Sequence, residues 1–232
     1  MVDYASFAGA FKGRKVFITG HTGFKGAWLS LWMHYLGAQV IGYSLAPPSQ
    51  PNMFESAGLE ERVTHIFGDI VDGPSLHEAL SHYRPEVVFH LAAQSLVRFS
   101  YVDPVLTYQT NVIGTANVLE GVRRISSVRG AVIVTSDKCY ENREWVWGYR
   151  ETEPMGGHDP YSSSKGCAEL VTSAYVRSFF PPEEYGKTHG VLVASTRAGN
   201  VIGGGDWGVD RLVPDCARFL SRGEEIVIRS PK

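Results

Sequence analysis

The fold of this chain is decided by residues 15–26, Lys15-Val16-Phe17-Ile18-Thr19-Gly20-His21-Thr22-Gly23-Phe24-Lys25-Gly26. The first five residues form a short apolar run that is typical of a buried β-strand. After the glycines, apolar residues recur at helical spacing until Gly37, where a helix is expected to end. A second strand is expected at residues 39–43. Strand, glycine-rich loop, helix and strand within about 30 residues predict a dinucleotide-binding unit.

The glycine spacing has a physical reason. Glycines let the backbone turn tightly and approach a pyrophosphate closely. The free N–H groups and the dipole at the start of the following helix can then hold the anion. The alternative is a glycine-rich turn without a ligand, and the flanking strands and helix disfavour it.

The rest of the chain alternates strands with helices. Further strands are expected at residues 65–70, 87–93, 131–134, 191–196 and 226–228, and helices at 52–59, 76–83, 104–124, 160–175 and 212–222. Six such units predict an α/β fold with a doubly wound parallel sheet of the Rossmann type. We expect residues 1–200 to form the dinucleotide-binding domain. Residues 201–232 would then begin a smaller C-terminal substrate lobe that is cut short.

Composition excludes several classes of protein. The 232 residues are 44% hydrophobic and 20% charged, as in ordinary globular domains, and 22 basic residues against 24 acidic ones give no field for nucleic acid or membrane surfaces. Three cysteines without a CxxC pair indicate neither a disulfide framework nor a zinc site, and no metal site is expected. Residues 1–4 do not begin a signal peptide, so we expect a cytoplasmic protein.

Three polar side chains follow the expected strand at residues 131–134. Ser136, Asp137 and Lys138 bring a hydroxyl, a carboxyl and an amine to the end of that strand. In open α/β sheets the carboxyl ends of the strands form the ligand site. The set suits proton transfer, and a hydrophobic core does not require it. The alternative is a polar strand end in which Asp137 caps a turn, and this stretch alone leaves both interpretations open.

Tyr161 and Lys165 are expected on one face of the helix that begins at Pro160, because they are four residues apart. An ammonium near a phenol stabilises the phenolate, which can take a proton from an alcohol near neutral pH. A YxxxK pair is common by chance. After a glycine loop, in the sixth unit of an alternating chain, it predicts an alcohol-oxidising site.

The connection at residues 141–159 is long and rich in aromatic residues, including Trp145, Trp147 and Tyr149. Loops of more than about 12 residues are usually functional or disordered, and the aromatic residues argue against disorder. We interpret this loop as a substrate lid. The alternative is a surface loop folded onto its own aromatic cluster.

These motifs together resemble the extended, nucleotide-sugar-modifying branch of the short-chain dehydrogenase/reductase superfamily, over almost the whole chain. The GxxGxxG loop, the YxxxK pair and the segment Arg197-Ala198-Gly199-Asn200-Val201-Ile202-Gly203 carry the resemblance. Ser136 and Asp137 match the 4,6-dehydratases of that branch, whereas Lys138 stands where glutamate is usual. With residues 142–150 and 199–207, this exchange resembles the CDP-glucose 4,6-dehydratases.

The resemblance implies NAD as cofactor, CDP-glucose as substrate, a homodimer or higher homo-oligomer formed through helices near 104–124 and 161–180, and a role in deoxysugar biosynthesis for lipopolysaccharide O-antigen. The cofactor would be bound by Gly20, Thr22, Gly23, Phe24, Gly26, Asp69, Ile70, Leu91, Ala92, Ala93, Thr110, Tyr161 and Lys165. The substrate would be bound by Ser95, Asn200 and Arg211. The stretch Tyr43-Ser44-Leu45 carries neither an acid nor an arginine, so the residues themselves do not choose NAD over NADP.

The resemblance also implies a mechanism. Tyr161, with Ser136 bonding the same oxygen, would remove the 4-hydroxyl proton as NAD takes hydride from C4. Asp137 would protonate the departing 6-hydroxyl, and hydride would return to C6. Lys138 would remove the C5 proton as a neutral amine, which needs a pKa well below about 10.4, or stabilise the enolate as an ammonium.

Two other functions stay open. A nucleotide-sugar 4-epimerase would use Tyr161 and Lys165 without an acid and a base at 137 and 138. A non-catalytic dinucleotide-binding module is the other, because the resembled enzymes continue well past Lys232.

Overall fold

The computed structural model describes residues 9–227. Within them, six parallel strands form one sheet in the order β3-β2-β1-β4-β5-β6. The strands are β1 (Lys15–Thr19), β2 (Gln39–Ser44), β3 (Thr64–Phe67), β4 (Val87–His90), β5 (Gly130–Val134) and β6 (Leu192–Thr196). The doubly wound parallel sheet is confirmed. Its strand order reverses between β1 and β4, and ligands bind at such points, beyond the carboxyl ends of the strands.

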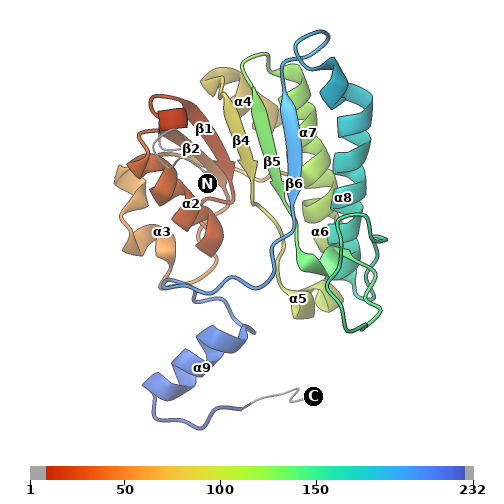
Figure 1. Cartoon of the computed structure of the whole chain (residues 1–232). Coiled ribbons are helices and arrows are strands. Elements are labelled where there is room, and N and C mark those ends of the chain that lie inside the picture. The colour runs from red at the N-terminus through yellow and green to blue at the C-terminus, as the bar shows by residue number, and fades with distance from the viewer. Residues whose placement is uncertain (1–8, 228–232) are drawn as a thin grey trace.

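Helices cover both faces of the sheet (Figure 1). They are α2 (Phe24–Tyr35), α3 (Met53–Ser56), α4 (Gly73–Tyr83), α5 (Val97–Val102), α6 (Pro104–Tyr108), α7 (Gly114–Arg124), α8 (Pro160–Phe179) and α9 (Leu212–Ser221). Short turns of other helix types are η1 (Leu59–Glu61), η2 (Gln109–Ile113), η3 (Asp137–Cys139) and η4 (Pro182–Glu184). No helix among residues 9–227 is long and apolar enough to cross a membrane.

The two faces of β1 enter two separate cores. Phe17 packs into a cluster with Leu80 and Leu119, which come from α4 and α7. Val16 and Ile18 point the other way, into a cluster that α2 and α3 complete. Successive side chains of a strand point to opposite faces, so a strand buried on both sides needs an unbroken apolar run. The residues of β1 supply that run.

Several elements differ from the expectation. Strands β3 and β4 end at Phe67 and His90, three residues early, and helix α5 was not foreseen. The expected helix at 104–124 contains the π-helical turn η2, in which Asn111 turns inward to bond Gln94 and Ser164. The expected strand at 226–228 is absent at 226 and 227, and residue 228 lies outside the described residues. The expectations for residues 1–4 also lie outside them.

The segment after β6 crosses the start of α2 before it reaches α9 (Figure 1). The indole N–H of Trp28 donates a hydrogen bond to the Gly204 carbonyl at 2.9 Å. A Cβ at Gly203 would lie 3.2 Å from the Phe24 ring. None of the residues of α9 is buried. The division of the chain at residue 200 stays a prediction.

Candidate active site

The glycine loop leaves the start of α2 open to an anion. Gly20 has φ +75°, and a Cβ there would lie 2.6 Å from the Ala92 amide nitrogen. A Cβ at Gly26 would overlap the Gly20 carbonyl. The N-cap of α2 is Gly23, which has no capping side chain, and the first turn carries no acidic residue. The N–H groups of that turn therefore remain available to a phosphate.

The neighbouring predicted cofactor residues line the same edge of the sheet. Thr22 is buried and bonds to Ser44 at 2.8 Å and to the Leu45 carbonyl at 2.9 Å, which ties the loop to the end of β2. Asp69 accepts a hydrogen bond from the Val71 N–H at 3.0 Å through one of its two carboxylate oxygens. Ile70 is buried and lies next to Gly114.

The remaining residues predicted to bind cofactor follow β4 or lie in η2. Leu91 and Ala92 donate their N–H groups to Thr19, each at 3.2 Å, and Ala93 follows them in the chain. Thr110 lies in η2 and is partly exposed. The ends of β1 and β4 and the turn η2 thus carry the predicted cofactor site together.

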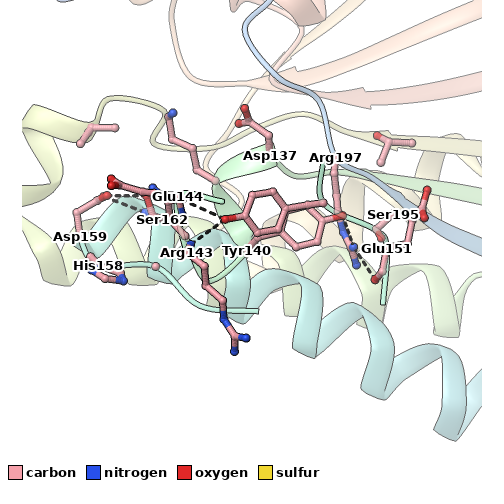
Figure 2. A pocket seen from close by; sticks show the side chains of 16 residues that line it. Asp137, Tyr140, Arg143, Glu144, Glu151, His158, Asp159, Ser162, Ser195 and Arg197 are labelled. Atoms are coloured by element: carbon pink, nitrogen blue, oxygen red, sulfur yellow. Dashed lines mark hydrogen bonds between the residues drawn. The ribbon is translucent and has the colours of Figure 1, made fainter. Parts of the chain in front are cut away.

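Ser136, rather than Asp137, caps the turn that follows β5. Its hydroxyl accepts the Lys138 N–H at 3.2 Å and donates to the Asp137 carboxylate at 3.0 Å. The alternative in which Asp137 is the cap is therefore wrong. Asp137 and Lys138 are exposed and line a cavity of about 1400 Å³ (Figure 2). The acid and the amine both face a space that a substrate can enter.

Tyr161 and Lys165 are buried on the first two turns of α8, whose N-cap is Asp159. Burial, followed by the positive charge of Lys25, lowers the pKa of Lys165 to about 8. Burial raises the pKa of Tyr161, and a hydrogen bond from Ser136 opposes that rise. The two groups therefore lie together, but the protein alone does not produce a phenolate.

The predicted substrate residues come from two segments. Arg211 donates to the Ser95 hydroxyl at 3.2 Å and lies 3.6 Å from the Asp206 carboxylate. Asn200 is exposed in the segment after β6. Its neighbour Gly199 is next to Asp137, because a Cβ there would lie 3.5 Å from the carboxylate. The segment after β6 therefore runs past the turn formed by residues 136–138.

Residues 17–182 match the sequence model of the family described as GDP-mannose 4,6 dehydratase, which is more than half of the chain. The chain belongs to the GDP-mannose 4,6-dehydratase family.

Two relatives of this family member are informative. CDP-glucose 4,6-dehydratase of Salmonella typhimurium is 55% identical over 221 residues, which are 95% of this chain and 61% of that protein. A dTDP-glucose 4,6-dehydratase of Xanthomonas campestris is 30% identical over 196 residues, which are 80% of this chain and 53% of that protein. The chain thus spans between about half and three fifths of these curated relatives.

Two solved structures are similar to this family member. UDP-glucose 4-epimerase of Thermotoga maritima, with UDP-glucose, has a TM-score of 0.80 at 25% identity and matches 94% of this chain and 66% of its own. dTDP-glucose 4,6-dehydratase of Bacillus anthracis, in complex with NAD, has a TM-score of 0.73 at 25% identity and matches 91% of this chain and 62% of its own.

His90 shows how a polar residue of this family member serves the fold. It is buried between Thr19, at 2.7 Å, and Thr115, at 3.1 Å. Burial, and then the charge of Lys165, lower the pKa of His90 to about 3, so the imidazole is neutral. The interpretation of His90 as a satisfied core histidine is confirmed.

The aromatic loop (residues 141–159) packs on itself and also lines the cavity. Tyr149 stacks on Tyr140 with ring centroids 5.2 Å apart, and Trp145 lies 5.3 Å from Tyr149. These contacts fit the alternative of a loop with its own cluster. Because Tyr149 also lines the cavity, a lid remains a prediction.

Three charged residues near this site had no role predicted from the sequence. Lys25 is half-buried in the first turn of α2, where the helix dipole disfavours a cation. Burial and then Arg211 lower the pKa of Lys25, whereas Asp137 opposes the effect. The signal was a lysine directly before the last glycine of the loop. Glu169 and Arg197, the other two, form an ion pair at 2.8 Å in which the carboxylate is buried and the guanidinium is partly exposed.

Proposed function

We propose that this protein is a nucleotide-sugar 4,6-dehydratase, an NAD-dependent lyase that converts CDP-glucose to CDP-4-keto-6-deoxyglucose. One observation carries the proposal: Asp137 and Lys138 stand side by side on the cavity, next to the buried pair Tyr161 and Lys165. Alcohol oxidation needs the second pair alone. The first pair adds the acid and the amine that elimination of water requires.

The residues present fit a dinucleotide. The uncapped start of α2 would hold the pyrophosphate, and the second oxygen of Asp69 could accept the adenine amine. NAD is supported by its presence in the structure of the similar dTDP-glucose 4,6-dehydratase. When bound, the cofactor supplies a reversible hydride acceptor and a positive charge that favours the phenolate of Tyr161.

Tyr161 takes the proton of the 4-hydroxyl, and Ser136 would turn its hydroxyl proton from Asp137 to the same oxygen. The burial of Tyr161 keeps water from this proton transfer. The buried ammonium of Lys165 stabilises the phenolate. Once C4 carries a ketone, the proton on C5 becomes acidic.

Asp137 then protonates the departing 6-hydroxyl, and Lys138 removes the C5 proton. Lys138 is exposed, so the described residues do not bury it. The substrate itself would have to cover the amine before its neutral form is favoured. We therefore assign to the substrate a part in activating Lys138.

Two basic side chains near Asp137 favour a diphosphate substrate. Lys25 and Arg211 lie close enough to each other and to Asp137 to affect the pKa of Lys25, and they could pair with the two negative charges of a nucleoside diphosphate sugar. The cavity itself is lined by acidic as well as basic side chains. Ser95, Asn200 and Arg211 would bind the diphosphate or the sugar. The cytidine base is supported by the 55% identical relative that is named for CDP-glucose.

We also propose a cytoplasmic homodimer or higher homo-oligomer that contributes to deoxysugar biosynthesis for O-antigen. Exposed apolar side chains on α6 and α8, such as Val105 and Leu170, support association through these helices.

The epimerase alternative is favoured by one observation, the TM-score of 0.80 with a UDP-glucose 4-epimerase. That likeness concerns the fold. Epimerisation would need neither the acid Asp137 nor the amine Lys138. The two functions differ in the mass of the product.

The test is incubation of the full-length natural protein with CDP-glucose and catalytic NAD, followed by mass spectrometry of the product. Loss of water supports the dehydratase, and an isomer of unchanged mass supports the epimerase. A protein that binds NAD but converts none of a panel of nucleoside diphosphate glucoses is a binding module.

A further inference from the structure

Glu169 is a buried carboxylate on the same helix as Tyr161 and Lys165. It follows Lys165 by one turn of α8 and is 5% exposed. One of its oxygens accepts the Thr135 hydroxyl at 2.5 Å. The other accepts the Ser195 hydroxyl at 2.9 Å and the Arg197 guanidinium at 2.8 Å. Glu169 therefore ties α8 to the ends of both β5 and β6.

Arg197 extends this connection to the aromatic loop. The nitrogen that does not bond Glu169 donates to the Tyr140 hydroxyl at 2.8 Å and to the Glu151 carbonyl at 2.9 Å, as Figure 2 shows. Its guanidinium also lies 5.0 Å from the centre of the Tyr140 ring. A planar guanidinium can hold several acceptors at fixed angles, which a lysine cannot do.

The polar turn (residues 136–138) lies between the two residues that this ion pair holds. Thr135, directly before the turn, is bonded by Glu169, and Tyr140, two residues after it, is bonded by Arg197. The backbone adds two bonds to the segment of Arg197, from Thr135 to Thr196 at 2.8 Å and from Asp137 to Ala198 at 3.1 Å. Both flanks of the turn are thus fixed to the helix of Tyr161 and Lys165.

The buried carboxylate of Glu169 is well satisfied by hydrogen bonds. Burial opposes ionisation of Glu169, but the hydrogen bonds from Arg197, Thr135 and Ser195 prevail and lower its pKa. The bond to Glu169 raises the pKa of Arg197. Both groups are therefore charged across the ordinary pH range. A buried carboxylate is costly to leave without its partners, so these bonds define one arrangement of the segments.

We infer that Glu169 and Arg197 are positioning residues, which hold the Ser136–Asp137–Lys138 turn against the Tyr161–Lys165 pair and link it to the aromatic loop. This inference rests on the proposed dehydratase function. Oxidation at C4 depends mainly on α8, whereas elimination also needs Asp137 and Lys138 in register with the sugar. Loss of the link therefore affects the second step more than the first.

Two variants of the full-length natural protein test this inference. Arg197→Lys keeps a positive charge beside Glu169 but removes the guanidinium nitrogen that bonds Tyr140 and Glu151. Tyr140→Phe removes only the hydroxyl that accepts from that nitrogen. The matched control is Arg123→Lys, because Arg123 also pairs with a glutamate, Glu120, and lies 5.0 Å from an aromatic ring, Phe179. Each variant is checked first for a cooperative thermal transition.

Single-turnover reactions with CDP-glucose measure the appearance of reduced nicotinamide and the loss of water separately. A misplacement of about 1 Å can slow a step about 100-fold. We expect elimination in Arg197→Lys to slow by about that factor, with a smaller loss in Tyr140→Phe, while C4 oxidation changes little and reduced cofactor accumulates. Arg123→Lys should match the parent. Equal slowing of both steps, or no change in either, overturns the inference.

A second measurement needs neither cofactor nor turnover. Limited proteolysis of the free protein reports how firmly residues 141–159 are held. We expect faster cleavage there in Arg197→Lys and Tyr140→Phe than in the parent and in Arg123→Lys. If the parent releases no dehydrated product, the proposed function fails. The cleavage rates then still decide the link to the loop, and unchanged rates overturn it.

Discussion

The ammonium groups of Lys25 and Lys165 approach the same site from α2 and α8, and burial followed by this like-charge repulsion lowers the pKa of Lys165 to about 8. The positive charge of Lys25 makes Lys165 harder to protonate. In the proposed reaction, Lys165 has to be charged to stabilise the Tyr161 phenolate. After burial, Lys25 therefore contributes to the upper pH limit of the first step.

Replacement of Lys25 by methionine tests this relationship. In the parent, C4 oxidation should fall as pH rises through about 8, because Lys165 loses its proton there. Removing the charge of Lys25 raises the pKa of Lys165, so this fall should move to higher pH in Lys25→Met. The pH dependence of the rate of nicotinamide reduction measures it. Lys187→Met, on an exposed lysine, is the control, and an unshifted profile in Lys25→Met would contradict the relationship.

Lys165 also makes the stability of the protein depend on pH. Its pKa is about 8 in the folded state, against the ordinary lysine value of 10.5 in the unfolded chain, so the unfolded chain binds more protons between these two values. Stability contributed by this group therefore rises as pH increases from about 8 to 10.5. Lys165→Met should remove this rise and increase the free energy of unfolding at pH 7 by roughly 1 to 3 kcal/mol.

Urea denaturation at pH 7 and at pH 10 measures this effect, with Lys187→Met as the matched control. The same Lys165→Met variant should lose activity. A gain in stability with a loss of function is expected where a buried charge serves chemistry. A loss of stability at pH 7 would show that the Lys165 charge is compensated.

The contact between Gly26 and Gly20 predicts a severe effect of one added methyl group. Gly26→Ala places a Cβ against the Gly20 carbonyl, which is backbone and cannot rotate away. We expect a loss of about 1 to 3 kcal/mol in the free energy of unfolding, together with weaker NAD binding measured by calorimetry. Gly148→Ala is the control, because a Cβ there meets nothing within 4 Å. Equal NAD affinity in both variants would argue against a pyrophosphate site at this loop.

Lys138→Ala separates the two halves of the proposed reaction. The variant should still reduce bound NAD with CDP-glucose, since Tyr161 and Lys165 are intact. It should release no dehydrated product, because the C5 proton has no acceptor. Absorbance of the reduced cofactor and the product mass report the two steps. Normal turnover by Lys138→Ala would remove Lys138 from the mechanism, whereas the dehydratase proposal would stand on Asp137.

The sheet could be predicted from the sequence because its signals are local. The apolar run of β1, the glycines after it and the regular alternation each depend on neighbouring residues. The predicted ends of β3 and β4 were three residues too late. Side chains of Asp69 and Thr19 bond the backbone that follows these strands, and the apolar residues in those stretches still fitted a strand pattern.

The site could be predicted in part. The strand-end position of Ser136, Asp137 and Lys138 and the spacing of Tyr161 and Lys165 follow from sequence order. Lys25, Glu169 and Arg197 could not be found in this way, because their importance arises where separate segments meet. A carboxylate four residues after Lys165 is unremarkable until the ends of β5 and β6 fold against it.

The position of β1 in the middle of the sheet has a consequence for synthesis. β1 pairs with β2 on one side and with β4 on the other, and Val16 is matched with Val87 across the second pairing. Because β1 leaves the ribosome before both of these partners, it must wait for about 70 further residues before both its edges are covered. During that interval an apolar segment stays exposed, so nascent chains of this protein should depend on chaperones until β4 has emerged.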